Sequence, residues 1–333
     1  MEWKKKSESY MKLSLVFLVE IIFLFVIISS FGGWVAGLSG GNVTVLTELK
    51  VGAVAPEVLN VSINNYASSI NLIPNSTKLV NCQALVRDWN NDTTITNVTA
   101  QFFEQGVGTY GGPNDNNFHY TNNSCFINRT FGTWNSIPDT PYTALANCTF
   151  HVWYYANPGT WNCTAKVTDN TNLTGYGSGN TTVAQLLAVG LPSSINYGTV
   201  NGTFVSNQNL TNVTNEGNTK LNLSLYGYGG TPGDNYAMSC TLGSTPHIPV
   251  SDEKYNLTVS HPGTISLTQF AVNYTNLTST YTVKKFNLAS RQNDLKAGTD
   301  DTNATYWRIY VPKGVAGNCS GYIVFGASTS PGS

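Results

Sequence analysis

Two short stretches decide the fold of this chain: VNCQALV at residues 80–86 and NCTAKV at residues 162–167. In both, residues alternate between an apolar face and a more polar one, which is the pattern of a β-strand with one buried face. Cys82 falls on the apolar face of the first stretch and Cys163 on the apolar face of the second. The two cysteines are therefore predicted to point into a sandwich core from strands that lie far apart in the sequence.

The composition of the whole chain agrees with a β-rich fold. Only 11% of its 333 residues are charged and the net charge is −1, so bulk electrostatics would not attract nucleic acid. Uncharged polar residues take the place of charge, with 39 Asn, 40 Thr and 28 Ser. Thr and Tyr favour strands while Asn and Gly favour turns, which argues against a mostly helical protein.

Strand-like runs with frequent turn signals predict an all-β protein with two tandem immunoglobulin-like β-sandwich domains, at residues 42–186 and 187–328, and a tail at 329–333. Within the first unit, the Gly-, Asn- and Pro-rich residues 104–146 predict a long, partly ordered excursion. Within the second, residues 264–273 are among the predicted strands.

The amino terminus predicts export. Residues 1–12 carry four lysines and form a basic cytoplasmic segment, and residues 13–35 form an apolar run of about the length that crosses a bilayer. An uncleaved signal anchor is favoured over a cleaved signal peptide because the run is long, although VAG at 35–37 offers a cleavage site. Glu20 within the run also suggests a type IV pilin, but no processing site precedes it.

Six cysteines in an exported chain predict disulfides, and no pair has the Cys-x-x-Cys spacing of a metal or redox site. Strand phase favours Cys82–Cys163, which leaves Cys125–Cys148 and Cys240–Cys319. The four cysteines of the first unit allow three connectivities, so phase alone leaves the alternatives open.

The chain carries 20 Asn-x-Ser/Thr acceptors, where chance placement of its hydroxyl residues would give about eight. Strand alternation alone can generate the triplet, but the same alternation places the Asn on the solvent face, so heavy N-glycosylation is predicted. The acceptors are Asn42, Asn60, Asn75, Asn91, Asn97, Asn122, Asn128, Asn147, Asn162, Asn172, Asn180, Asn201, Asn209, Asn212, Asn222, Asn256, Asn273, Asn276, Asn303 and Asn318.

The segment GTWNC at residues 159–163 resembles the Gly-x-Tyr-x-Cys segment of an immunoglobulin F strand, with Trp161 in the position of the tyrosine corner. The Trp expected on strand C is not evident, because Trp89 lies too close to Cys82. The resemblance therefore implies an immunoglobulin-like sandwich rather than a true immunoglobulin domain.

The second unit is similar to the immunoglobulin-like modules of archaeal and bacterial surface proteins. The resemblance lies in TNEGNTKLNL at residues 214–223, YWRIYVP at 306–312 and GNCSGYIVF at 317–325, where Cys319 stands at a position often held by Tyr. It implies an exported envelope protein, of archaeal type, without catalytic activity.

Catalytic motifs do not hold up. GVGTYG at residues 106–111 is not followed by a helix, GLSGG at 37–41 follows the apolar run rather than a strand, and no paired carboxylates are marked out by spacing. No histidine has metal-ligand spacing, and all are predicted to lie at the surface: His119, His151, His247 and His261.

One weak ligand pattern remains. Asp88, Asn90 and Asp92 offer oxygens at alternate positions, as calcium loops do, but Asx turns are the favoured use of this loop. No other cofactor is predicted.

These observations predict a membrane-attached or secreted surface glycoprotein that is not an enzyme and acts in adhesion, cell contact or envelope structure. The expected partners are the membrane, other surface proteins or glycans, and further copies of the chain. One alternative is a filament subunit that donates residues 43–54 as a strand to a neighbour. Another is a protein that binds or hydrolyses glycans.

Overall fold

A computed structural model describes residues 45–292 and 301–331. Among the described residues, 45–51 belong to one unit, and 52–292 and 301–331 form a second, compact one. The predicted basic segment, the apolar run at residues 13–35 and Asn42 lie outside the described residues.

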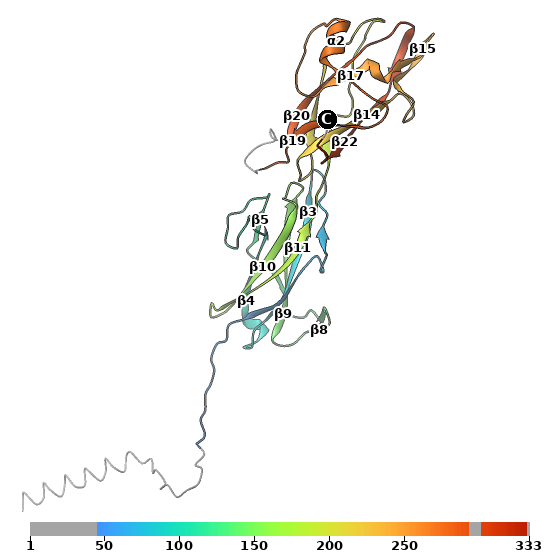
Figure 1. The fold of residues 1–333 in the computed structure, drawn as a ribbon. Helices are drawn as coiled ribbons and strands as arrows, with labels where there is room; N and C mark the ends of the chain where they lie inside the picture. The colour runs from blue at the N-terminus through green and yellow to red at the C-terminus, as the bar shows by residue number, and fades with distance from the viewer. Residues whose placement is uncertain (1–44, 293–300, 332–333) are drawn as a thin grey trace, which may run out of the picture. The chain divides into compact units, whose positions relative to one another are not determined.

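The described chain is built from strands, as predicted, and strands before residue 184 form sheets separate from those that begin at residue 189 (Figure 1). One sheet of the first group has the order β1 (Glu57–Ile63), β3 (Thr77–Arg87), β9 (Thr143–Trp153) and β6 (Phe126–Asn128). The other has the order β2 (Ser69–Ile70), β11 (Thr174–Val183), β10 (Gly159–Asp169), β4 (Ile95–Glu104) and β5 (His119–Asn122).

The core of the first group forms where the alternation predicts it. Cys82 on β3 and Cys163 on β10 are fully buried in one apolar cluster, together with the other residues of their faces. Leu85 lies on the opposite face of β3 and is buried as well, because it packs with Trp134 and Leu145 in a second, smaller cluster. Trp134 belongs to a small hairpin of β7 (Thr133–Trp134) and β8 (Ile137–Pro138). The predicted excursion at 104–146 thus contains short strands that extend the core.

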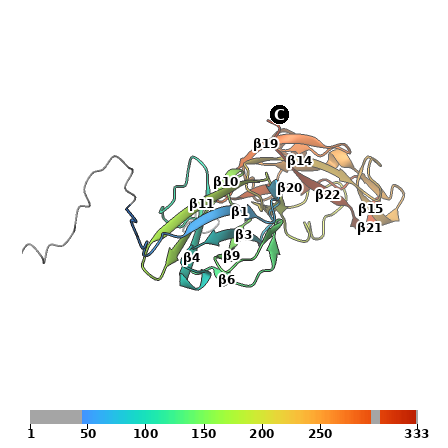
Figure 2. The same ribbon diagram turned by 90° about the horizontal axis from the view of Figure 1, so that it is seen from below.

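The glycines of β11 let a strand of the opposite sheet approach closely. A Cβ on Gly175 would lie 2.0 Å from the carbonyl oxygen of Pro56, and one on Gly179 would lie 2.6 Å from that of Val61. Figure 2 shows β1 beside β11 at this edge. Glycine is therefore required at alternate positions of β11 because the backbone of the β1 segment occupies the space of side chains.

Trp161 plays the part expected of the tyrosine corner. Its ring is fully buried against Phe102, at 4.8 Å between ring centroids, and its Nε1 donates to the carbonyl oxygen of Asn157, four residues upstream. The aromatic ring thus anchors the start of β10 to the preceding turn.

The second group contains three sheets. The largest has the order β12 (Val189–Gly190), β13 (Asn209–Asn215), β20 (Thr302–Ile309), β17 (Glu253–Asn256) and β18 (Thr275–Asn276). A second has β19 (Thr282–Leu288), β14 (Leu221–Tyr228) and β22 (Tyr322–Ser328), and a third has β16 (His247–Pro249), β15 (Tyr236–Gly243) and β21 (Val315–Ser320).

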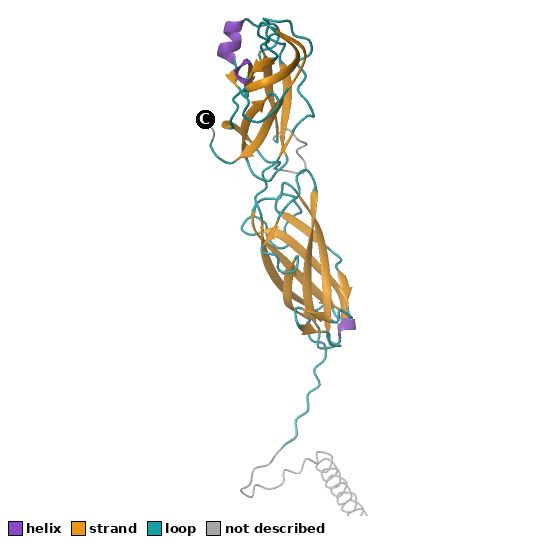
Figure 3. Ribbon diagram, turned by 90° about the vertical axis from the view of Figure 1, so that its right-hand side faces the viewer, coloured by secondary structure: helices purple, strands orange, loops and turns teal. Residues whose placement is uncertain are grey.

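The prediction of a strand at residues 264–273 is wrong, because residues 264–266 form no strand and the helix α2 (Leu267–Asn273) follows them, drawn in purple in Figure 3. Ser266 and Gln269 form a capping box, each side chain accepting a hydrogen bond from the other residue's backbone amide. The structure also has two single-turn 3-10 helices, η1 (Asp92–Thr94) and η2 (Val250–Asp252).

Candidate interaction surface

A long strand edge in the second group has a partner on one side only. β21 pairs with β15 and β22 pairs with β14, and each of the two is the last strand of its sheet. Only Gly321 separates them, so residues 315–328 contain the edge strands of both sheets in succession. A Cβ on Gly321 would lie 1.8 Å from the carbonyl oxygen of Ala237, which explains why glycine stands at this junction. This edge 315–328 presents backbone groups that no other described strand pairs.

Residues 191–200 lie beside this edge without forming a strand themselves. Ile195 and Tyr197 alternate inward and pack against the core cluster, while Asn196 between them is exposed. Two hollows flank the segment. One of about 290 Å³ is lined in part by Ile195 and Ile323, and one of about 730 Å³ in part by Tyr197 and Cys319.

A buried carboxyl group on β17 forms a hydrogen bond with this segment. The hydroxyl of Tyr197 donates to Oε1 of Glu253 on β17 at 2.8 Å. Burial raises the pKa of Glu253 to about 7, although the bond from Tyr197 opposes that change, and burial raises the pKa of Tyr197 well above its usual value. Glu253 therefore keeps its proton to a higher pH than an exposed carboxyl group does, and its hydrogen bond with Tyr197 connects the segment 191–200 to β17.

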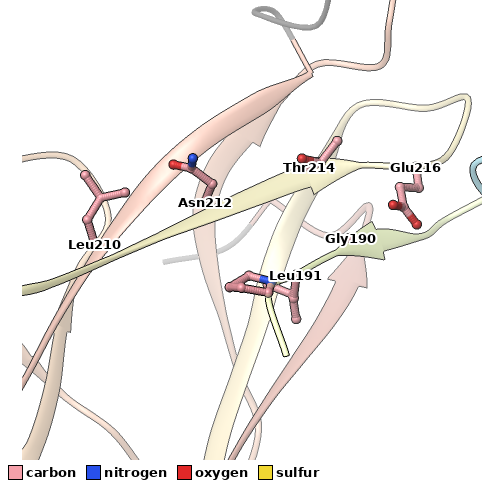
Figure 4. A pocket seen from close by; sticks show the side chains of 7 residues that line it. Gly190, Leu191, Leu210, Asn212, Thr214 and Glu216 are labelled. Carbon is pink, nitrogen blue, oxygen red and sulfur yellow. The ribbon is translucent and has the colours of Figure 1, made fainter. Parts of the chain in front are cut away.

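A third hollow, of about 420 Å³, continues along the start of the same segment (Figure 4). Leu191 and Leu210 supply apolar surface there, Asn212 and Thr214 point from β13, and Glu216 lies beside Gly190. Glu216 is the one acidic side chain among the residues that line this hollow. A lone carboxylate does not form the acid–base pair that glycan hydrolysis uses.

Residues 45–51 present apolar side chains to solvent. Val45, Leu46, Leu49 and Val51 are 75, 82, 89 and 68% exposed, and the segment belongs to no sheet among the described residues. The chain that follows is held by Asn90, whose Oδ1 accepts from the amide of Val54 and whose Nδ2 donates to the carbonyl oxygen of Gly52.

The loop of Asp88, Asn90 and Asp92 uses its side chains within the protein. Oδ1 of Asp88 accepts from the amide of Asn90 in an Asx turn, and Oδ2 accepts from Thr94. The side chain of Asn90 turns away to residues 52–54, as described above. Across the described ranges, no group of three or more His, Cys, Asp and Glu side chains gathers as metal ligands would.

The structure joins Cys82 to Cys163, Cys125 to Cys148 and Cys240 to Cys319, and leaves no cysteine free. The first pair is the one that strand phase favours, and the other two are the pairs that this choice leaves. Cys82 and Cys148 face each other on the neighbouring strands β3 and β9, so the first two bridges lie side by side in the core. The third bridge ties β15 to the edge strand β21.

Most glycosylation acceptors within the described ranges lie at positions with exposed or half-exposed side chains. The exposed ones are Asn75, Asn172, Asn180, Asn201, Asn212, Asn276, Asn303 and Asn318. Asn222 is an exception at 8% exposure: its Oδ1 accepts from the amides of Phe286 and Asn287, and its Nδ2 donates to the carbonyl oxygen of Ser330. The prediction that alternation turns Asn222 to solvent is therefore wrong, because β19 and the chain end cover that face of β14.

The prediction of a surface position is also wrong for His119, which is fully buried. Its ring stacks on Phe103, and burial lowers its pKa. Residues 106–111 form turns and an isolated bridge rather than a phosphate-binding loop with a helix behind it. Among the helices in the described ranges, none is long and apolar enough to span a bilayer.

No family model and no curated protein matches the sequence. Solved β-proteins resemble it weakly. In the chaperone–tip adhesion subunit pre-assembly complex of Csu pili from Acinetobacter baumannii, the match has 11% identity and a TM-score of 0.35, and covers 78% of this chain and 97% of that one.

Two other matches are similar in extent. The match with a structure that concerns the promiscuous specificity of carbohydrate-binding modules of the β-sandwich superfamily has 13% identity and a TM-score of 0.24. It covers 83% of this chain and 97% of that one. The match with the carboxyl-terminal domain of the antigen I/II-family protein AspA from Streptococcus pyogenes has 11% identity and a TM-score of 0.23, and covers 84% of this chain and 97% of that one.

Proposed function

We propose that this chain is an exported, N-glycosylated surface protein with a non-catalytic role in adhesion, cell contact or envelope structure. The observation that carries the proposal is the oxidation state of the cysteines. All six form disulfides, of which two lie inside the first core and the third lies at the strand edge. Thiols buried in a reducing cytosol would stay reduced, so such a protein belongs to an oxidising compartment.

Two further features support the proposal. The exposed acceptor asparagines lie on strands and loops of both groups of sheets, where attached glycans would compensate for the low surface charge. The hollows beside residues 191–200 are lined by apolar and uncharged groups, with acidic side chains standing singly at Glu216 and at the buried Glu253. A surface of this kind suits contact rather than acid–base chemistry.

The test uses protein recovered from its native cells. Alkylation without reduction should label no cysteine, and intact mass should exceed the 36.0 kDa polypeptide and fall on enzymatic or chemical removal of N-glycans. Protease added to intact cells should shorten the chain. Free thiols together with an unmodified mass would overturn export, glycosylation and the surface role at once.

A filament subunit is the second candidate, and a specific observation favours it. The segment 45–51 exposes four large apolar side chains to solvent. A contiguous exposed apolar patch is typical of a site that binds another protein, because burying it there removes the apolar surface from water. Deleting residues 42–54 should abolish polymerisation while circular dichroism still reports the β fold. A chain whose sedimentation is the same with and without the deletion would end this candidate.

A further inference from the structure

The segment 45–51 exposes apolar side chains, and the edge 315–328 has no strand partner on its outer side among the described residues. We propose that residues 45–51 of one copy of this chain add as a strand to the edge 315–328 of a second copy, beside that copy's segment 191–200. The inference rests on the filament function and names the acceptor surface and its occupant, a second copy of the chain.

The lengths of donor and acceptor agree. Seven extended residues span about 23 Å at the rise of a β-strand, and β22 is also seven residues long. The edge as a whole, residues 315–328, is about twice that length, so the donor fits without reaching past either end.

The side-chain pattern of the donor suits a strand with one buried face. Val45, Leu49 and Val51 share one face with Thr47, and Glu48 and Lys50 lie on the other face together with Leu46. The acceptor edge contains no charged residue between 315 and 328, so neither charge of the donor meets a like charge on it. Apolar side chains would enter the hollows beside Ile195 and Tyr197, and the charged ones would stay in water.

The acceptor is unfinished in two ways. The outer backbone groups of β21 and β22 have no strand partner in the described chain, and Tyr322 at their junction is 58% exposed. Residues 191–200 cover part of the neighbouring core with Ile195 and Tyr197 but leave hollows of about 290 and 730 Å³ on either side. A strand added at the edge would pair these backbone groups, and its side chains would fill the hollows.

The buried area is of the right order for a specific contact. Burying the three apolar side chains of the donor removes about 300 Å² of its surface from water. With the donor backbone and the matching acceptor area, the total reaches about 1,000 Å², where specific interfaces begin. Because each copy both donates and accepts, the contact is head-to-tail and generates a filament or a ring.

The first experiment maps the contact in the full-length chain. Benzoylphenylalanine replaces Leu49, light and isotope-labelled copies are mixed before assembly, and cross-linked peptides are identified by mass spectrometry. The expected product joins position 49 of one copy to residues 191–200 or 315–328 of the other. The same label at Val272 on α2, which is 78% exposed, is the matched control and should give no such product.

The second experiment measures assembly by sedimentation. Leu49→Asp should raise the critical concentration for assembly about tenfold or more, whereas Lys50→Asp, which adds the same side chain on the opposite face, should change it less than about threefold. Equal effects of the two substitutions would overturn the proposed strand geometry.

The outcomes separate the inference from the function on which it rests. Assembly with cross-links to another surface of the second copy, or to the same copy, overturns the acceptor and leaves the filament standing. Absence of assembly at any concentration, with the 42–54 deletion without effect, removes the filament and the inference with it.

Discussion

The buried carboxyl group beneath residues 191–200 makes a quantitative prediction about pH. Glu253 is 1% exposed and its pKa is raised to about 7, mainly because burial disfavours the ionised form. An acid whose pKa is higher in the folded state than in the unfolded one binds more protons when folded. Its contribution to stability is therefore complete below the ordinary pKa of 4.5 and is lost as pH rises through 7.

The expected magnitude follows from the size of that interval. From 4.5 to about 7 the free energy of unfolding should fall by about 3 kcal/mol at most, and it should be flat above pH 8 as far as this residue is concerned. Asp252, next in the chain and half-buried, has its pKa raised in the same direction, chiefly by burial and against the attraction of Lys254. Solvent screening makes its contribution the smaller of the two.

Glu253→Gln isolates the larger contribution. The amide oxygen can still accept the hydrogen bond from Tyr197 but carries no charge at any pH. The variant should therefore lose most of the decline between pH 4.5 and 7.5 and be more stable than the wild type above pH 7.5. Urea denaturation from pH 4 to 8 measures this, with the fluorescence of Trp307, which is buried against Tyr255 on the same strand as Glu253, among the reporters.

Glu216→Gln is the matched control, since it removes a half-buried carboxylate from the same group of sheets outside this core. The control should keep the decline of the wild type. A Glu253→Gln variant whose stability falls with pH as steeply as the wild type would refute the assignment of the decline to this carboxyl group.

Three further predictions concern packing and modification. Asn222 should carry no glycan in the folded protein, whereas the exposed Asn212 is accessible to glycosylation. Glycopeptide mapping checks both sites, and a glycan on Asn222 would contradict the hydrogen bonds that its side chain accepts from Phe286 and Asn287. Arg308→Met should lower the free energy of unfolding by about 3 kcal/mol, because the fully buried guanidinium donates hydrogen bonds to the carbonyl oxygens of residues 206, 261 and 263. Urea denaturation measures the loss, and a loss below about 1 kcal/mol would show that these hydrogen bonds contribute little. Gly175→Ala should destabilise by about 2 kcal/mol or more because its Cβ would meet the carbonyl oxygen of Pro56. Gly202→Ala is the control, because nothing lies within 4 Å of a Cβ there and neither glycine has a positive φ, and urea denaturation of both variants checks the difference.

Local pattern was a reliable guide where one strand face meets one core. Cys82 and Cys163 could be placed on inward faces because alternation is a property of the strand itself, and their burial follows from it. The same rule failed at Asn222, where another segment covers the outer face of the strand, and the outer face of β3 is covered in a similar way at Leu85. Alternation reports which residues share a face and carries no information about what lies against that face.

The pattern of the 88–92 loop was ambiguous for a related reason. Alternating oxygens serve either a cation or the turns of the backbone, and the choice depends on where the neighbouring chain runs. Here residues 52–54 pass close enough for Asn90 to bond them, and Asp88 satisfies its own loop.

By itself, the sequence determined the strand content, the inward phase of the first two cysteine strands and the apolar alternation of residues 45–51, because each depends on neighbours along the chain. Only the tertiary structure decided that Cys82 and Cys148 lie opposite each other yet form disulfides with other cysteines, and that the buried Glu253 accepts a hydrogen bond from Tyr197. It also decided that residues 315–328 end two sheets with no further strand partner in the part of the chain that the structure describes. Those features depend on contacts between segments tens to more than a hundred residues apart, which local periodicity does not encode.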